Sequence, residues 1–334
     1  MLDAMRTIAQ RLRTGLTGAT ALGVLGASLP LPAAAQGAVD PNVAPRASEL
    51  NRQGERGLGI EMLGRYLAVA QSDGRAWFLL SRFYRMDARD WHLAGHRGDP
   101  SAEVYLSLAT VAVDEATRLR VDSAPLFRAL VAMDEALLAL EDSGWTAVVR
   151  SMGGGLPPLP PAVLELGRNL AASCPLDGVL VTGSELESLA AWHATLEPGG
   201  RADLVPLRVD LFVRDSLYRR RMAEALAVDA TVPTQAALAQ VARRRPLCLA
   251  PAADTTGMPP EPWTPRRLAR VSNAAAPAAT GFSLTSLVTD VTSGGSIWTP
   301  EVVAAYATGA RHNDLLCQSL APVAGVLPAG TCAR

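Results

Sequence analysis

Residues 178–187 read GVLVTGSELE, and they indicate a strand that leads directly into a helix. The run 178–183 is short, apolar and bounded by glycines, which is typical of a buried strand. Ser184 stands three residues before Glu187, which is the spacing of a capping box, and a helical pattern follows over 185–196. A strand followed at once by a helix is the repeating unit of an α/β domain.

The same alternation extends through residues 163–334. Further helices are expected over 163–173, 216–227 and 235–244, and further strands over 204–209, 246–250 and 282–288. Pro206 favours the start or the edge of its strand, because proline donates no backbone hydrogen bond. The order predicts a mostly parallel sheet with helices on both faces.

Residues 48–150 show a different pattern, with apolar residues at helical spacing and short turns between the helices. Within them, Trp77-x-x-Leu80-Ser81-x-x-Tyr84 resembles the first-helix pattern of tetratricopeptide repeats, with serine in place of glycine. An ordinary helical bundle without repeats is the alternative. Stacked helix pairs expose a concave face that usually binds protein, so Trp77 and Tyr84 are candidate partner-binding residues. Residues 86–100 are expected to be a polar insertion.

Two segments rich in glycine and proline separate these regions. Residues 36–47 are expected to be a flexible lead-in. Residues 151–162, SMGGGLPPLPPA, are the best candidate for a linker between a helical domain and an α/β domain.

The first 35 residues are similar to an export signal. Three arginines precede an apolar stretch, and Ala33-Ala34-Ala35 matches the small-residue pattern before a cleavage site. An uncleaved membrane anchor is the alternative, but glycine and proline interrupt a run shorter than the roughly 20 residues a spanning helix needs. The signal therefore predicts a periplasmic or otherwise extracytoplasmic protein, either free or peripheral to the membrane. No later segment has about 18 uninterrupted apolar residues, so we expect no transmembrane span in the mature chain.

The composition excludes several functions. All 31 basic residues are arginine, and a chain without lysine has neither the phosphate-binding lysine of a P-loop nor a Schiff-base amine. The formal net charge of −1 argues against a nucleic-acid binder. No G-x-G-x-x-G motif is present, and no cofactor is predicted.

The four cysteines allow two disulfides in an exported protein. Cys317–Cys332 is the favoured pair, because the residues between them are rich in proline and glycine and can form a closed loop. Cys174 and Cys248 could then pair if their segments are neighbours, or remain two buried thiols.

The second half also resembles the soluble C-terminal part of the DUF2723 family of bacterial membrane proteins, which are related to protein O-mannosyltransferases. The resemblance rests on the order of elements and on these segments: 180–185, 191–193, 201–205, 218–219, 245–247 and 281–282. The acidic loop of the family is reduced here to Gly183, Ser184, Glu185 and Glu187, and the membrane-embedded part is missing. The resemblance therefore implies an extracytoplasmic α/β module and does not imply transferase activity.

Three groups of residues are candidate sites. Thr182, Gly183, Ser184, Glu185 and Glu187 could bind a polar ligand at the end of a strand, but the capping box explains the same residues. His92 and His96 could share a helix face and bind a metal, or pair with neighbouring arginines. The basic cluster Arg219, Arg220 and Arg221 could contact a partner, or could be a solvated helix face.

These observations favour a non-catalytic exported scaffold or accessory subunit that binds protein partners in an envelope or membrane complex. One alternative is an enzyme or a polar-ligand or glycan-binding protein that uses the Thr182–Glu187 loop. A second alternative is a periplasmic chaperone that captures peptides on the helical face.

Overall fold

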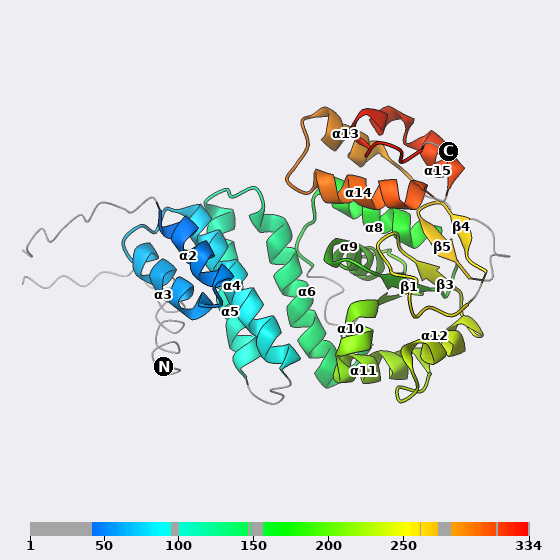
Figure 1. Ribbon diagram of the computed structural model, residues 1–334, viewed down its shortest axis with the longest axis horizontal. Coiled ribbons are helices and arrows are strands. Elements are labelled where there is room, and N and C mark those ends of the chain that lie inside the picture. The colour runs from blue at the N-terminus through cyan, green and yellow to red at the C-terminus, as the bar shows by residue number, and fades with distance from the viewer. Residues whose placement is uncertain are drawn as a thin grey trace, which may run out of the picture. The chain divides into compact units, whose positions relative to one another are not determined.

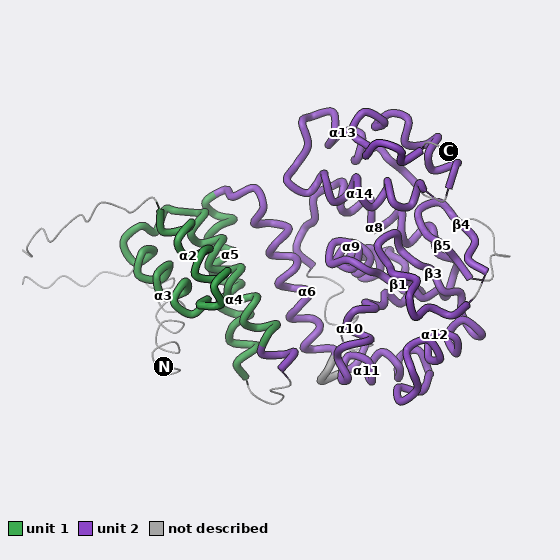
Figure 2. Tube along the Cα trace, viewed as in Figure 1, with its two compact units in different colours: residues 1–90, 99–119 green, residues 91–98, 120–334 purple. Residues whose placement is uncertain are grey.

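The computed structural model describes residues 42–94, 100–145, 148, 156–260, 262–272, 282–311 and 313–332. They form two compact units (Figure 2): unit 1 lies within residues 1–90 and 99–119, and unit 2 lies within residues 91–98 and 120–334. The division falls after Leu119 and not at the predicted linker 151–162. The predicted signal peptide lies outside the described residues.

Unit 1 is helical, as its periodicity predicts. Its helices are α2 (Val43–Arg52), α3 (Arg56–Leu67), α4 (Gly74–Leu93, whose last three residues belong to unit 2) and α5 (Ser101–Arg118). The core joins α2, α3 and α4 through Ala47, Leu63, Leu67, Ala76, Leu80 and Phe83. The expected flexible lead-in is wrong from residue 43 onward, because the buried side chains of Val43 and Ala47 anchor α2 to this core.

The turn before α4 is fixed by one aspartate. Asp73 Oδ1 accepts the backbone N–H groups of Arg75 and Ala76, both at 3.0 Å, and so caps the helix. Close packing follows: a Cβ atom on Gly59 of α3 would lie 3.0 Å from the Phe83 ring and 3.1 Å from the Ala47 carbonyl oxygen. A side chain at residue 59 would therefore require Phe83 or the Ala47 carbonyl group to move by a few tenths of an ångström.

The predicted polar insertion over 86–100 is wrong in its first half, because α4 continues as a helix to Leu93. Arg56 of α3 holds this part of α4 in place, since its Nη1 atom lies 2.7 Å from both Asp87 Oδ1 and Asp90 Oδ2. Residues 95–99 lie outside the described residues.

Unit 2 contains a five-stranded sheet in the order β2-β1-β3-β5-β4. The strands are β1 (Val179–Thr182), β2 (Val205–Arg208), β3 (Leu247–Leu249), β4 (Thr264–Arg266) and β5 (Ala269–Val271). β1 pairs in parallel with β2 and β3, whereas β5 pairs antiparallel with β3 and with β4. The sheet is therefore mixed, and the expected mostly parallel sheet is correct for three strands. Pro206 lies on the edge strand β2, as its chemistry predicts.

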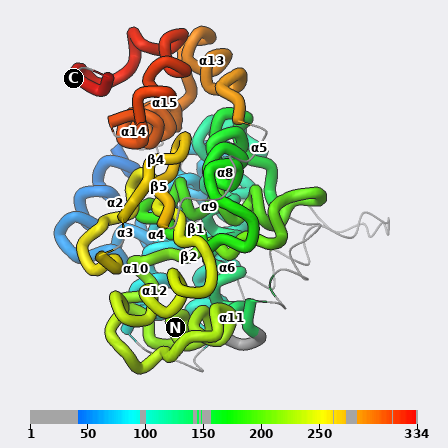
Figure 3. Tube along the Cα trace, turned by 90° about the vertical axis from the view of Figure 1, so that its right-hand side faces the viewer, coloured from blue at the N-terminus to red at the C-terminus, as the bar shows by residue number. Residues whose placement is uncertain are grey.

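Helices surround this sheet. They are α6 (Ala124–Ser143), α8 (Pro161–Ser173), α9 (Glu185–Leu196), α10 (Val209–Arg214), α11 (Ser216–Leu226), α12 (Thr234–Ala242), α13 (Thr285–Thr292), α14 (Thr299–Ala310), α15 (Asp314–Ser319) and the 3-10 helix η1 (Ala321–Val326). α9 contacts β1 and β2 and packs along α8, and α13 and α14 pack on α8. Within unit 2, α13, α14 and α15 lie at one end and α11 and α12 at the opposite end, with the sheet between them (Figures 1 and 3).

The expected strand over 282–288 is wrong, because α13 occupies this region. The helix is stabilised by a residue that is far away in the sequence. The Glu165 carboxylate on α8 accepts the backbone N–H groups of Ser286 and Leu287, each at 2.9 Å, and thereby caps the first turn of α13. Among the described residues, no helix combines the length and the apolar character that crossing a membrane requires.

Candidate functional site

The carboxyl edge of the parallel strands is the first place to look for a site. β1 lies between β2 and β3, and the chain passes from β1 to β2 on one side before it returns to β3 on the other. Ligands of open α/β sheets bind where the strand order reverses in this way, beside the loops that follow the strands. Here these loops are Gly183–Ser184 after β1 and Ala250–Ala253 after β3.

The side chain of Glu187 fills this position. Its Oε1 atom accepts the N–H group of Ala252 at 2.8 Å, and its Oε2 atom accepts that of Gly183 at 3.2 Å. Glu187 is only 1% exposed, and burial raises the pKa of its carboxyl group, although the hydrogen bonds from the backbone oppose the shift. The backbone donors that would face a polar ligand at this edge are therefore bound to a carboxylate of the chain itself.

Gly183 brings the two loops into direct contact. A Cβ atom at this position would lie 1.9 Å from the Ala252 carbonyl oxygen, so no other residue fits without moving the backbone. The loop after β1 and the loop after β3 thus pack backbone against backbone. This contact closes the edge at the point where the strand order reverses.

The remaining polar groups of the loop also have internal partners. The Ser184 hydroxyl accepts the N–H group of Glu187 at 3.2 Å, so the capping interaction predicted from the sequence is confirmed. Thr182 Oγ1 lies 2.8 Å from Ser188 Oγ and 3.3 Å from the Leu207 carbonyl oxygen, and all three groups are buried. The five predicted ligand-binding residues include two carboxylates. Glu187 is buried, whereas Glu185 is half-buried and so keeps some access to solvent at this edge.

Arg208, at the end of β2, is a site residue that the sequence reasoning missed. It is 3% exposed, and its guanidinium group binds both carboxylate oxygens of Asp210, at 3.2 and 2.6 Å. Burial disfavours its charge, but the pair with Asp210 and the nearby Glu185 and Asp134 raise the pKa of Arg208. The sequence feature that could have identified this pair is the Arg-x-Asp spacing at the end of the strand, Arg208-Val209-Asp210.

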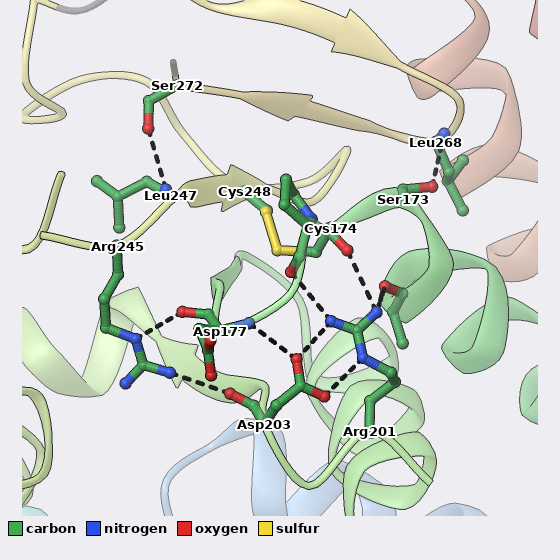
Figure 4. Close-up of a disulfide and its surroundings, with 12 residues drawn as sticks. Ser173, Cys174, Asp177, Arg201, Asp203, Arg245, Leu247, Cys248, Leu268 and Ser272 are labelled. Atoms are coloured by element: carbon green, nitrogen blue, oxygen red, sulfur yellow. Dashed lines mark hydrogen bonds and ion pairs between the residues drawn. A yellow bond between two sulfur atoms is a disulfide. The ribbon is translucent and has the colours of Figure 1, made fainter. Parts of the chain in front are cut away.

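The same spacing occurs at the opposite, amino edge of the sheet, in Arg201-Ala202-Asp203 (Figure 4). Arg201 binds both oxygens of Asp203 at 2.7 Å, and it donates to the carbonyl oxygens of Ala171, Cys174 and Pro175 at 3.0 to 3.2 Å. This pairing lowers the pKa of Asp203 to about 2. Arg201 therefore holds the end of α8 against the start of β2.

Arg245 and a disulfide complete the amino edge (Figure 4). Arg245 donates to the carbonyl oxygens of Asp177 and Asp203, at 2.6 and 3.0 Å. Cys174 and Cys248 form a buried disulfide between the end of α8 and β3, with their Cα atoms 5.7 Å apart. The segments 201–205 and 245–247 were quoted above for the resemblance to the DUF2723 family. In this structure their residues Arg201, Asp203 and Arg245 make contacts that hold the fold together.

Of the two metal candidates, His92 and His96, only His92 lies within the described residues. His92 Nε2 lies 2.7 Å from Asp215 Oδ2, and both residues belong to unit 2, whereas His96 lies outside the described residues. Asp215 also caps α11 by accepting the N–H groups of Leu217 and Tyr218. Burial alone would raise the pKa of Asp215, but these hydrogen bonds lower it to about 2. In the described part of the chain, no group of three or more potential ligands is arranged to hold a metal ion.

The predicted basic cluster is divided between internal contacts and solvent. Arg219 lies 5.1 Å from the centre of the Phe212 ring, donates to the Ala230 carbonyl oxygen at 2.8 Å, and so fixes the loop between α11 and α12. Arg221 pairs with Glu224 on its own helix at 3.1 Å. Arg220 is the exposed member of the three.

The two aromatic candidates in unit 1 also make internal contacts. Trp77 and Tyr84 both pack against the helical core, and the Trp77 indole donates to the Gln71 carbonyl oxygen at 2.9 Å. Tyr84 stacks on Tyr105, with ring centres 6.5 Å apart, and burial raises its pKa to about 12. Both residues therefore contribute to the packing of unit 1.

The comparisons with known proteins give no relative. No protein-family model, no curated protein sequence and no solved structure matches this chain. The functional argument therefore depends on the geometry described above.

Proposed function

We propose that this chain is an exported, non-catalytic accessory protein that binds a protein partner in a bacterial envelope or membrane complex. The observation that carries the proposal is the closure of the carboxyl edge of the sheet. Glu187 accepts the two backbone N–H groups that a polar ligand at this edge would use. A catalytic site that stabilises an oxyanion through backbone donors would need such groups to face a substrate.

The disulfides support an extracytoplasmic location. Cys174–Cys248 and Cys317–Cys332 account for all four cysteines of the chain. Disulfides form and persist in oxidising compartments such as the periplasm, and they are rare in the cytosol. Together with the predicted signal peptide, they favour a protein that folds after export.

We further propose that unit 1 supplies the partner-binding surface and is related to tetratricopeptide repeats. Ser81, at the small-residue position of the repeat pattern, is fully buried beside the core residue Leu80. Unit 1 also exposes large apolar side chains: Leu58 on α3 is 53% exposed and Val69, just after α3, is 78% exposed. Contiguous exposed apolar surface rimmed by polar residues marks protein-binding sites, and we propose that Leu58 and Val69 belong to such a surface.

A capture experiment tests this function. Tagged residues 36–334 would be used to isolate partners from membranes extracted with mild detergent. We expect one partner to be retained by the wild type and reduced at least tenfold by Leu58→Glu combined with Val69→Glu. Leu315→Glu in unit 2 is the control, because Leu315 is also a strongly exposed apolar residue, at 74%, and its substitution should leave capture unchanged.

Two results would contradict the proposal. Equal capture by all three proteins would remove unit 1 as the binding surface. A strictly monomeric pool without a partner would remove the accessory role itself.

A ligand at the Thr182–Glu187 loop is the competing function, and Glu185 is the residue that tests it. Thermal unfolding would be measured with panels of glycans and small anions. We expect no saturable stabilisation of the wild type. A saturable stabilisation that Glu185→Ala abolishes would favour the ligand-binding alternative.

A further inference from the structure

The two disulfides of unit 2 differ in their access to solvent. Cys174 and Cys248 are both fully buried, and the Cys174 sulfur lies in a tight environment, since a Cβ atom on Gly178 would lie 2.4 Å from it. Cys332 is exposed, and Cys317 is half-buried on α15. Thiol–disulfide exchange needs a thiolate to reach one sulfur of the bond, so access decides which disulfide reacts first.

The segment closed by Cys317–Cys332 has few buried side chains, and its packing on the rest of unit 2 is through η1, which contacts α13 and α15. In residues 321–332, Val323 and Thr331 are the two buried side chains. The backbone hydrogen bonds described for this segment are local: Val323 donates to Leu320, Leu327 to Ala324, and Thr331 to Pro328. Besides the packing of η1, the covalent bond to Cys317 is therefore the restraint that joins the C-terminal segment to α15.

The surroundings of Cys317 accommodate the reduced form. Its sulfur lies 3.5 Å from the Ala310 carbonyl oxygen, within the distance at which a thiol can donate a hydrogen bond to oxygen. Asn313 caps α15 by accepting the N–H group of Leu316 at 3.2 Å, and this contact does not involve the disulfide. α15 can therefore persist when the bond opens, while the segment after it is released.

We propose that Cys317–Cys332 is a thiol-exchange site, at which an external dithiol opens the bond and releases residues 321–332 while Cys174–Cys248 stays intact. One thiolate of the dithiol attacks the exposed Cys332 sulfur, the bond between the cysteines breaks, and Cys317 leaves as a thiolate that takes a proton from water. The second thiol of the dithiol then attacks the mixed disulfide and releases the Cys332 thiolate. The dithiol is oxidised to a disulfide, and the protein is reduced by two electrons.

This exchange goes beyond the proposed partner binding and does not depend on it. A partner that fails to appear would leave the exchange at Cys332 unaffected.

Graded reduction of the native protein tests the site. The folded chain would be incubated with dithiothreitol, alkylated at intervals and analysed by mass spectrometry of the cysteine peptides. We expect Cys317 and Cys332 to become alkylated at least tenfold faster than Cys174 and Cys248. Equal rates, or faster alkylation of Cys174 and Cys248, would overturn the proposal.

Hydrogen exchange tests the structural consequence. After selective reduction, we expect the amides of residues 321–332 to exchange at least tenfold faster, while those of β1 and β3 keep their rates. The variant Cys317→Ser with Cys332→Ser should show the same pattern without reductant, because it lacks the bond from the start. Unchanged exchange in residues 321–332 in both proteins would contradict the release of the segment.

Discussion

Asp203 at the amino edge of the sheet accepts the backbone N–H group of Asp177 at 2.9 Å, and Glu187 at the carboxyl edge accepts two backbone N–H groups. Asp203 also pairs with Arg201, which lowers its pKa to about 2. Glu187 lies against the backbone N–H groups of Gly183 and Ala252, and burial raises its pKa. The comparison teaches that the amino edge is held by paired charges and a disulfide, whereas the carboxyl edge is closed by a carboxylate whose ionisation is unfavourable.

The two edges should respond to pH with opposite signs. The pKa of Asp203 is lower in the folded protein than in the unfolded protein. Its contribution to the free energy of unfolding is therefore fully present above the unfolded pKa and is lost as pH falls toward 2. The pKa of Glu187 is higher in the folded protein than in the unfolded protein, so its ionised form lowers the free energy of unfolding. Protonation of Glu187 removes this unfavourable contribution as pH falls. The ionised carboxylate is therefore favoured at the amino edge and disfavoured at the carboxyl edge, where α/β proteins bind ligands.

The largest effect is expected at the amino edge from Cys174→Ser combined with Cys248→Ser. The bond closes a sequence separation of 74 residues, so its loss should lower the free energy of unfolding by about 4 kcal/mol. Urea unfolding measures the change. Cys317→Ser with Cys332→Ser is the control: it opens a separation of 15 residues and should cost about 3 kcal/mol or less. A larger loss in the control would reverse the assigned importance of the two bonds.

The carboxyl edge should be weakened next by Glu187→Ala. The change removes the two hydrogen bonds that the partly buried N–H groups of Gly183 and Ala252 donate to the carboxylate, which should lower the free energy of unfolding by about 3 kcal/mol. Denaturant unfolding at neutral pH measures the loss. Glu185→Ala is the matched control on the same helix, because Glu185 is half-exposed and should have a much smaller effect.

Asp203→Asn should produce a smaller effect that depends on pH. The variant removes the charge that faces Arg201, so we expect it to lower the free energy of unfolding by about 2 kcal/mol at pH 7. Because the wild-type carboxylate becomes protonated as pH falls, the difference between the two proteins should shrink between pH 4 and its folded pKa of about 2. A difference that stays constant over this range would exclude the charge pair as its cause.

The smallest effect should come from Ser184→Ala, which removes the cap of α9. The lost hydrogen bond to the Glu187 N–H group should lower the free energy of unfolding by about 1 kcal/mol. Ser184→Asp keeps an acceptor at this position and should retain most of the stability. If both variants lose the same amount, the cap is not the reason.

Local sequence signals predicted the elements that surround this edge. The capping box set the start of α9, and the helix spans Glu185–Leu196 as expected. The apolar run before it became β1, because glycine on both sides limits the strand. These features depend on residues within one turn or one strand, so they can be read along the chain.

The features that failed depend on distant partners. Residues 282–285 alternate between apolar and polar side chains as in a strand, but Leu284, Leu287, Val288 and Val291 have helical spacing. The contacts of Glu165 of α8 with the first turn then favour the helix α13. The β4–β5 hairpin was missed, because its strands have three residues each and β4 contains Pro265. The closure of the site was missed for the same reason, since the acceptor Glu187 and the donor Ala252 are joined only by the fold.

The most direct test of the closed carboxyl edge uses acetate and formate with the Glu187→Ala variant. Removing the carboxylate side chain leaves the N–H groups of Gly183 and Ala252 beside a space that a small carboxylate can enter. The thermal unfolding temperature of the variant should rise with acetate or formate and should not rise with an equal concentration of chloride, while the wild type should not respond. A wild type that is itself stabilised by these carboxylates, or a variant as stable as the wild type without them, would contradict the account.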